Sequence, residues 1–298
     1  MPGETLCDPI ADAVAALEHT PVGPGLAAAL APLEPTTLTG SQVVDLLKAR
    51  YRQANHERAQ LFAVITEAMR RTQAETVVPE HIWPVEFAAD EIRAALVLTR
   101  TATEGLCGLA EDVARRLPTV QAAFADGIID QPRVRVFSLW TLGLSDPHTA
   151  AVVAALLPKA HQLTTAQLIH QIQRHAIALD PDWARRRYER ALRGRRVVGR
   201  RNEDGTANLS GYDLPTDQVA AACDRLDRLA KAAKQAGHPD PIDHLRADLF
   251  LGMTDGSYQG LTDPQILHRL LTQTNLTQPP PDQPGTKQPT TDQPDEEK

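Results

Sequence analysis

Apolar side chains recur at every third or fourth position through most of the chain, a spacing that is typical of amphipathic helices. The longest such run covers residues 41–73 and predicts one long helix with a continuous apolar face. Further helical patterns occupy residues 91–98, 101–117, 118–124, 147–157, 164–179, 181–193, 216–236, 243–251 and 264–272. We therefore expect a mainly α-helical, multi-helix bundle-like domain over residues 41–272.

The helical pattern is replaced by strand-like segments in one region. Residues 195–201 and 206–214 are short segments separated by the turn-forming sequence Asn-Glu-Asp-Gly. This arrangement predicts one small β-hairpin near residues 195–214. On the helix that follows, Cys223 shares the apolar face with Leu226 and Leu229, so we expect its thiol to lie in the core.

The two ends of the chain differ from the region between them. Residues 1–40 combine a short helical pattern with prolines at positions 21, 24, 32 and 35, which predicts a loosely ordered lead-in. Residues 273–298 are rich in Pro, Gln, Thr and Asp and have no apolar periodicity. We expect this acidic tail to be disordered.

Composition narrows the classes of protein to which the chain can belong. A hydrophobic content of 42% is enough for a core, and an aromatic content of only 4% favours packed helices. Cys7, Cys107 and Cys223 are far apart and form no Cys-x-x-Cys pair, which argues against a disulfide framework or a zinc ribbon. The N-terminus lacks the features of a leader, and no apolar run reaches about 18 residues. We expect a cytoplasmic protein with no membrane partner.

Positive charge is concentrated in one short stretch of an otherwise acidic chain. The formal net charge is −7, yet residues 185–201 contain nine arginines and one glutamate. These nine arginines are the candidate nucleic-acid-binding residues: Arg185, Arg186, Arg187, Arg190, Arg193, Arg195, Arg196, Arg200 and Arg201.

Helical geometry predicts where the first of these arginines lie. At 100° per residue, Ala184, Tyr188, Ala191 and Leu192 form one face that we expect to be packed. The opposite face carries Arg186, Arg190 and Arg193, and the adjoining strand carries the last four arginines. Guanidinium groups in such a row suit the phosphates of DNA or RNA, contacted along the backbone without base readout.

Two other interpretations of the arginines remain open. Glu189 lies four residues from both Arg185 and Arg193, a spacing that allows surface ion pairs. The acidic remainder of the chain, an acidic partner protein or a second copy could also pair with these arginines. The third interpretation is a solvated face with no partner.

Residues 91–106 have some features of a helix-turn-helix. Ile92, Leu96, Leu98 and Leu106 have the spacing of its core, and Thr99 is placed to cap the second helix. However, Val97 stands at the turn position where glycine is favoured, and the second helix offers few groups for phosphate or base contact. An ordinary helical hairpin is the favoured interpretation.

Catalytic, metal and cofactor motifs are not recognisable. His170 and His175 are five positions apart and do not share a helix face as a metal-binding pair would. Asp243 and His244 resemble the start of an HNH nuclease motif, but no further histidine, asparagine or cysteine pair follows at the required spacing. We expect no catalytic residue, no metal site and no cofactor.

Several short motifs resemble the actinobacterial 13E12 repeat family, also called domain of unknown function 222. Each motif is weak alone, but their order and spacing across residues 41–256 are specific. The motifs occupy residues 89–96, 116–119, 122–128, 179–182, 204–210 and 246–249.

The resemblance implies a helical domain that commonly precedes an HNH endonuclease module. Because no such module follows residue 256, the resemblance does not bring nuclease activity to this chain. Three functions remain: a non-catalytic accessory domain that binds nucleic acid, a protein-interaction or self-assembly module, and a nuclease subunit completed by a separate HNH module.

Overall fold

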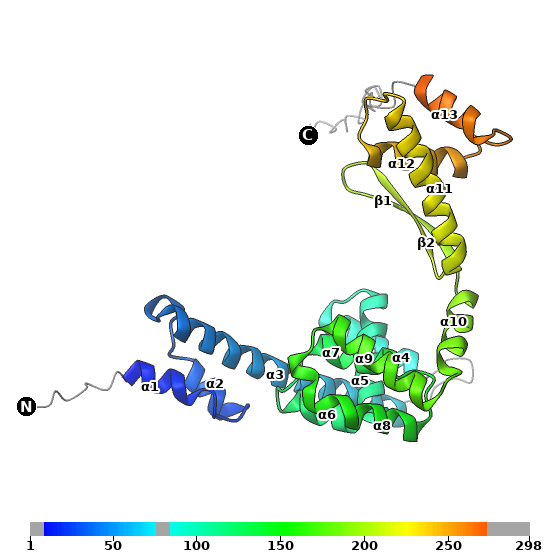
Figure 1. Cartoon of the computed structure of the whole chain (residues 1–298). Coiled ribbons are helices and arrows are strands. Elements are labelled where there is room, and N and C mark those ends of the chain that lie inside the picture. Colours follow the sequence, from blue (N-terminus) through cyan, green and yellow to red (C-terminus); the bar gives the residue numbers. More distant parts are fainter. Residues whose placement is uncertain (1–8, 76–83, 273–298) are drawn as a thin grey trace, which may run out of the picture. The chain divides into compact units, whose positions relative to one another are not determined.

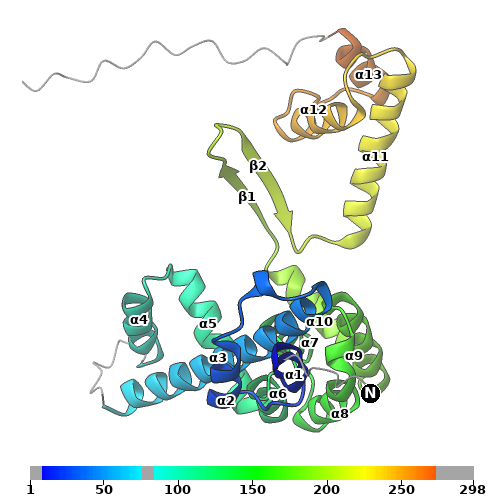
Figure 2. The same ribbon diagram turned by 90° about the vertical axis from the view of Figure 1, so that its left-hand side faces the viewer.

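The computed structural model describes residues 9–75 and 84–272, and its chain divides into two compact units, Met1–Arg190 and Ala191–Lys298. Each unit is considered by itself. The described residues contain thirteen α-helices and one antiparallel pair of strands, labelled in Figures 1 and 2. The prediction of a mainly helical fold with one small hairpin is therefore confirmed. The acidic tail expected at residues 273–298 lies outside the described residues.

The first unit is built along the long helix α3 (Gly40–Glu75). The first half of α3 packs against α1 (Pro9–Ala16) and α2 (Pro24–Leu30), which are joined to α3 through the 3₁₀ turn η1 (Pro35–Thr37). Leu17, Leu26 and Leu30 are fully buried there. Part of the expected lead-in thus forms two helices that share a small core with α3 (Figure 1).

The second half of α3 belongs to a larger helical core. Around it lie α4 (Pro84–Leu96), α5 (Arg100–Arg116), α6 (Pro118–Ala125), α7 (Gln131–Trp140), α8 (Asp146–Leu156), η2 (Leu157–Gln162) and α9 (Thr165–Leu179). Phe62 of α3 meets Phe124 of α6 edge to face, with ring centroids 5.5 Å apart. Such a pair stabilises the core beyond the area that it buries.

Polar residues fix the starts of several of these helices. The Thr99 hydroxyl accepts from the Ala102 amide, and Thr164 forms a reciprocal capping box with Gln167, as the sequence predicts for both threonines. Helix α7 is missing from the sequence-based prediction. Asp130 caps it and Pro132 stands in its first turn, a start signal that the weak apolar pattern of the helix obscured.

The last helix of the first unit is α10 (Trp183–Arg193), which belongs to this unit as far as Arg190. The second unit contains strands β1 (Arg196–Arg201) and β2 (Ala207–Tyr212), followed by α11 (Thr216–Gln235), α12 (Ile242–Thr254) and α13 (Asp263–Thr272). Its core is formed by α12, α13 and the second half of α11, including Leu229, Ala230 and Ala233.

The first half of α11 contributes no residue to this core. Cys223 is exposed, and Val219 keeps 40% of its surface accessible. The prediction of a buried Cys223 is therefore wrong, because α12 and α13 cover only the later turns of the helix.

Candidate nucleic-acid interface

The arginines of α10 begin next to a buried tryptophan. Trp183 is 2% exposed, and its indole Nε1–H donates to the Leu142 carbonyl at 3.0 Å. One turn later the Arg187 guanidinium lies 4.3 Å from the centre of the Trp140 ring and donates to the Leu139 carbonyl at 2.8 Å. Desolvation and the nearby Arg190 lower the pKa of Arg187. Arg187 is thus part of the packing between α10 and the end of α7.

The neighbouring arginines of α10 are also paired within the first unit. Arg186 forms an ion pair with Asp180 at 2.5 Å and donates to the Gly143 carbonyl at 3.3 Å. Arg185 pairs with Asp182 at 3.2 Å and with Glu189 at 3.4 Å, as the spacing of Glu189 suggests.

The packed face that we expected on α10 is therefore wrong, although Arg186, Arg190 and Arg193 are exposed, as the helical geometry predicts. Ala184, Tyr188 and Ala191 were expected to face the core, but all three are exposed, and Tyr188 keeps 44% of its surface accessible. The helix packs instead through Trp183 and Arg187. A helical projection that places every alanine in the core and every arginine in solvent fails at Arg187. The Arg187 side chain packs on Trp140, and its guanidinium donates to the Leu139 carbonyl.

The hairpin arginines have fewer partners. Arg195 donates to the Leu192 carbonyl at 3.0 Å. Arg196 contacts Asp213 at 3.4 Å and lies over the Tyr212 ring, 4.8 Å from its centre. Arg200 and Arg201 are exposed, and their side chains make no hydrogen bond or ion pair with any residue that the structure describes.

The strand register fixes the direction of these side chains. Arg196 is opposite Tyr212, Val198 opposite Ser210, and Arg200 opposite Asn208. Directly opposed residues of an antiparallel pair share a face, and successive residues alternate between faces. Arg196 and Arg200 therefore share one face, and Arg201 lies on the other.

The nine candidate arginines thus fall into two groups, one in each unit. In the first unit, Arg185, Arg186 and Arg187 already have partners, and a nitrogen of Arg190 lies close to Gly143. In the second unit, residues 193–201 contain five arginines and no acidic residue. The Arg193 side chain, like those of Arg200 and Arg201, has no hydrogen-bond or ion-pair partner in the described part of the chain.

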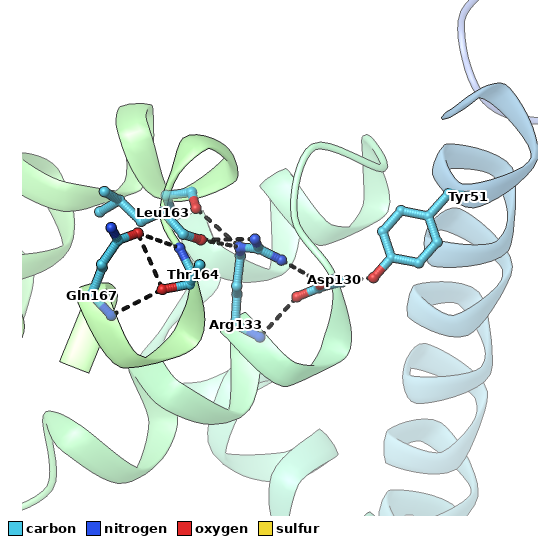
Figure 3. A network of polar contacts seen from close by, with 7 residues as sticks. Tyr51, Asp130, Arg133, Leu163, Thr164 and Gln167 are labelled. Atoms are coloured by element: carbon cyan, nitrogen blue, oxygen red, sulfur yellow. Dashed lines mark hydrogen bonds and ion pairs between the residues drawn. The ribbon is translucent and has the colours of Figure 1, made fainter. Parts of the chain in front are cut away.

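A partly buried polar network in the first unit was not found from the sequence. Asp130 accepts from the Tyr51 hydroxyl at 2.7 Å and from Arg133, and Arg133 also donates to the Leu163 carbonyl at 2.7 Å (Figure 3). The hydrogen bond to Asp130 raises the pKa of Tyr51, and burial adds to the effect. The hydroxyl of Tyr51 and the guanidinium of Arg133, which also donates to the Ala160 carbonyl, thus tie α3, α7 and η2 together.

A second network joins α5 to α7. Arg116 holds Asp112 with two hydrogen bonds of 2.8 and 2.9 Å, and the Ser138 hydroxyl donates to the same carboxylate at 2.6 Å. Desolvation opposes ionisation of Asp112, but the hydrogen bonds from Arg116 and Ser138 outweigh it and lower its pKa. Ser138 therefore donates to a carboxylate whose lowered pKa makes it a weak base for activating the hydroxyl.

Comparison with known proteins agrees with the motifs. The model of a family described as Domain of unknown function (DUF222) matches residues 48–248. The chain belongs to the DUF222 family. No curated protein and no solved structure gives a match. The DUF222 region contains all nine candidate arginines and the whole hairpin, but the family description assigns them no ligand.

The DUF222 region also contains a cavity of about 350 Å³ that involves α3, α4 and α5. Its arginines face carboxylates: Arg93 pairs with Asp90 at 3.2 Å and Arg100 with Glu104 at 2.7 Å. Burial and then the charge of Glu111 raise the pKa of Cys107, which lines the same cavity. A thiol with a raised pKa is a poor nucleophile, so the cavity is a weak candidate for covalent chemistry.

The connection between α4 and α5 resembles the turn of a helix-turn-helix. Val97 has φ of 52° and is 90% exposed, and Thr99 caps α5 as the motif requires. The first turn of α5, however, presents Arg100 bound to Glu104. Because this guanidinium is neutralised by its own helix, the hairpin is the stronger candidate for contact with nucleic acid.

Metal-binding clusters and membrane-spanning helices are absent from the described ranges. No three histidine, cysteine, aspartate or glutamate side chains there gather in a way that could hold a metal ion. No helix in those ranges has the length and apolar character needed to cross a bilayer.

Proposed function

We propose that this DUF222 protein is an accessory nucleic-acid-binding protein whose contact surface is the arginine-rich hairpin of its second unit. One observation carries the proposal: Arg200 and Arg201 are exposed without a carboxylate partner, in a stretch of five arginines that contains no acidic residue. Elsewhere in the second unit, arginines such as Arg225 and Arg228 are paired with aspartates.

Unpaired guanidinium groups are suited to phosphate oxygens. An arginine that is already in an ion pair must lose that partner before it binds a phosphate, whereas Arg200 and Arg201 exchange only water. A protein that neutralises backbone phosphates releases condensed counterions, so its affinity falls steeply as salt rises. The proposed contact should therefore show a steep loss of affinity with rising salt, which a neutral interface lacks.

Fluorescence anisotropy over a series of salt concentrations tests the proposal with labelled duplex DNA, single-stranded DNA and RNA. We expect salt-dependent binding, and Arg200→Gln/Arg201→Gln should reduce the slope of log affinity against log salt by about 1.8 on duplex DNA. Arg225→Gln/Arg228→Gln removes the same charge from paired positions of the same unit and should leave the slope nearly unchanged. Absence of binding at low salt, or equal losses in both variants, would contradict the proposal.

A second candidate function, self-association, is favoured by a different surface. Val43, Val44, Leu47 and Tyr51 form an exposed apolar stripe on the first half of α3, and Leu47 keeps 64% of its surface accessible. Stripes of this kind on a helix suit contact with a second helix. Light scattering should then detect a dimer of the unsubstituted chain and a monomer of the double variant Val44→Gln/Leu47→Gln. A monomer at all concentrations would exclude this function.

A further inference from the structure

The hairpin presents two faces of different chemistry. One face, here called the polar face, carries Arg196, Val198, Arg200, Asn202, Asn208, Ser210 and Tyr212. The opposite face carries Val197, Gly199, Arg201, Ala207, Leu209 and Gly211. All strand residues except half-buried Ser210 are exposed, and Figure 2 shows the ribbon standing clear of α11, α12 and α13 within its unit.

Side chains of the polar face are suited to base edges as well as phosphates. Arg200 stands directly opposite Asn208, and its guanidinium is free of protein partners in the described residues. The amides of Asn202 and Asn208 donate to each other at 3.4 and 3.2 Å, which orients Asn208 and leaves its amide one further N–H. The Asn202 amide also donates to the Thr206 hydroxyl at 2.8 Å, so its two N–H groups are both in use. Arginine recognises guanine through O6 and N7, and asparagine recognises adenine through N6 and N7.

The size of the ribbon favours duplex DNA. Two strands of six residues extend about 20 Å, which is the length of about six base pairs. The major groove of B-DNA accepts a two-stranded ribbon, whereas the major groove of an RNA helix is too narrow for side chains to read.

The aromatic content of the hairpin argues against single strands. Single-stranded nucleic acid is bound largely by stacking of bases on exposed aromatic rings. Tyr212 is the one aromatic residue of the two strands, and the Arg196 guanidinium already covers its ring at 4.8 Å. The ribbon therefore lacks a free platform for an unpaired base.

Charge decides how the ribbon meets the duplex. The turn carries Glu203 and Asp204, so an approach with the tip first would bring carboxylates against phosphates. The Asp204 carboxylate accepts from the amide and the hydroxyl of Thr206, which holds it against its own turn. Positive charge is spread over the whole length of β1, because Arg196 is its first residue and Arg200 and Arg201 are its last two, next to the turn. A lengthwise approach by one face is the arrangement that this charge distribution favours.

We propose that the polar face of the hairpin lies in the major groove of duplex DNA and that Arg200 and Asn208 contact base edges there. The inference rests on the proposed function and goes further, because it names the groove, the face and the reading residues. Arg201, on the opposite face, contributes charge without readout.

Methylation protection with dimethyl sulfate tests the inference on the full chain bound to a duplex of mixed sequence. The reagent modifies guanine N7 in the major groove. We expect protection of guanine N7 in the complex, and Arg200→Lys should weaken it while preserving the charge and the salt dependence, because an ammonium lacks the planar pair of donors. Arg201→Lys, the matched change on the opposite face, should leave the protection intact.

Selection of binding sites from a random duplex pool gives an independent readout. Arg200→Lys and Asn208→Ala should each reduce discrimination at one base position by about 5- to 150-fold. Three results would overturn the inference and leave the proposed function standing. They are salt-dependent binding without N7 protection, protection that Arg200→Lys does not change, and preferred binding to single strands or RNA. Failure to bind any nucleic acid would overturn both.

Discussion

Arg187 is predicted to stabilise the first unit and to contribute nothing to nucleic-acid binding. Its guanidinium lies 4.3 Å from the Trp140 ring centre, 5.6 Å from the Trp183 ring centre and 2.8 Å from the Leu139 carbonyl. A partly desolvated cation–π contact is worth about 1–2 kcal/mol, and a hydrogen bond from a charged donor about 1.5–3 kcal/mol. Because the two contributions overlap, Arg187→Ala should lower the free energy of unfolding by about 2–4 kcal/mol.

Urea unfolding followed by tryptophan fluorescence measures this loss, since Trp140 and Trp183 flank the substituted side chain. Arg187→Lys keeps the positive charge but lacks the planar guanidinium group. We therefore expect it to lose less stability than Arg187→Ala. Arg185→Ala is the control on the same helix. It removes two exposed ion pairs and should change the free energy of unfolding by less than about 0.5 kcal/mol.

Nucleic-acid affinity measured below the unfolding transition completes the experiment. Arg187→Ala should bind as tightly as the unsubstituted chain, because its guanidinium is directed to carbonyls and rings of its own unit. If Arg187→Ala instead keeps its stability and loses nucleic-acid affinity, Arg187 belongs to the contact surface and not to the packing of the first unit.

Three further predictions concern single side chains. Because the folded-state pKa of Asp112 is lowered, its contribution to stability is present above about pH 4 and is lost as the pH falls through that lowered value. The difference in unfolding free energy between the unsubstituted chain and Asp112→Asn, measured by urea unfolding, should therefore shrink in that range. A constant difference would contradict the lowered pKa of Asp112. In a Cys7→Ser background, a thiol reagent should modify exposed Cys223 quickly and buried Cys107 slowly, as followed by mass spectrometry, and equal rates would contradict both placements. Val97→Gly should raise the unfolding free energy by about 0.5–1 kcal/mol, because a β-branched residue is strained at φ of 52°, and a destabilised variant would contradict this backbone conformation.

Local signals made most of the helices predictable. Thr99 and Thr164 cap helices where the sequence places them, and the Asn-Glu-Asp-Gly turn marks the hairpin. These features depend on interactions between residues a few positions apart, so a single sequence is enough to show them. Asp130 carried the same kind of signal for α7, and the Pro132 that follows it supports the same start.

The contacts of individual faces were not predictable in the same way. Arg187 is held by Trp140 and by the Leu139 carbonyl, both more than 40 positions away, and nothing near position 187 reveals them. Cys223 lies on an apolar helix face, but whether another helix covers that face depends on the length and direction of α12 and α13. Of the candidate site, the sequence showed the cluster of arginines, and only the tertiary contacts separate paired from unpaired guanidinium groups.

We propose that the hairpin arginines contact nucleic acid and that Arg186 and Arg187 of α10 do not. Arginine side-chain Nε–Hε signals in NMR spectra report this directly when duplex DNA is added to the full chain. We expect the signals of Arg200 and Arg201 to shift and those of Arg186 and Arg187 to stay in place. Shifts confined to Arg186 and Arg187, or no shift at low salt, would contradict it.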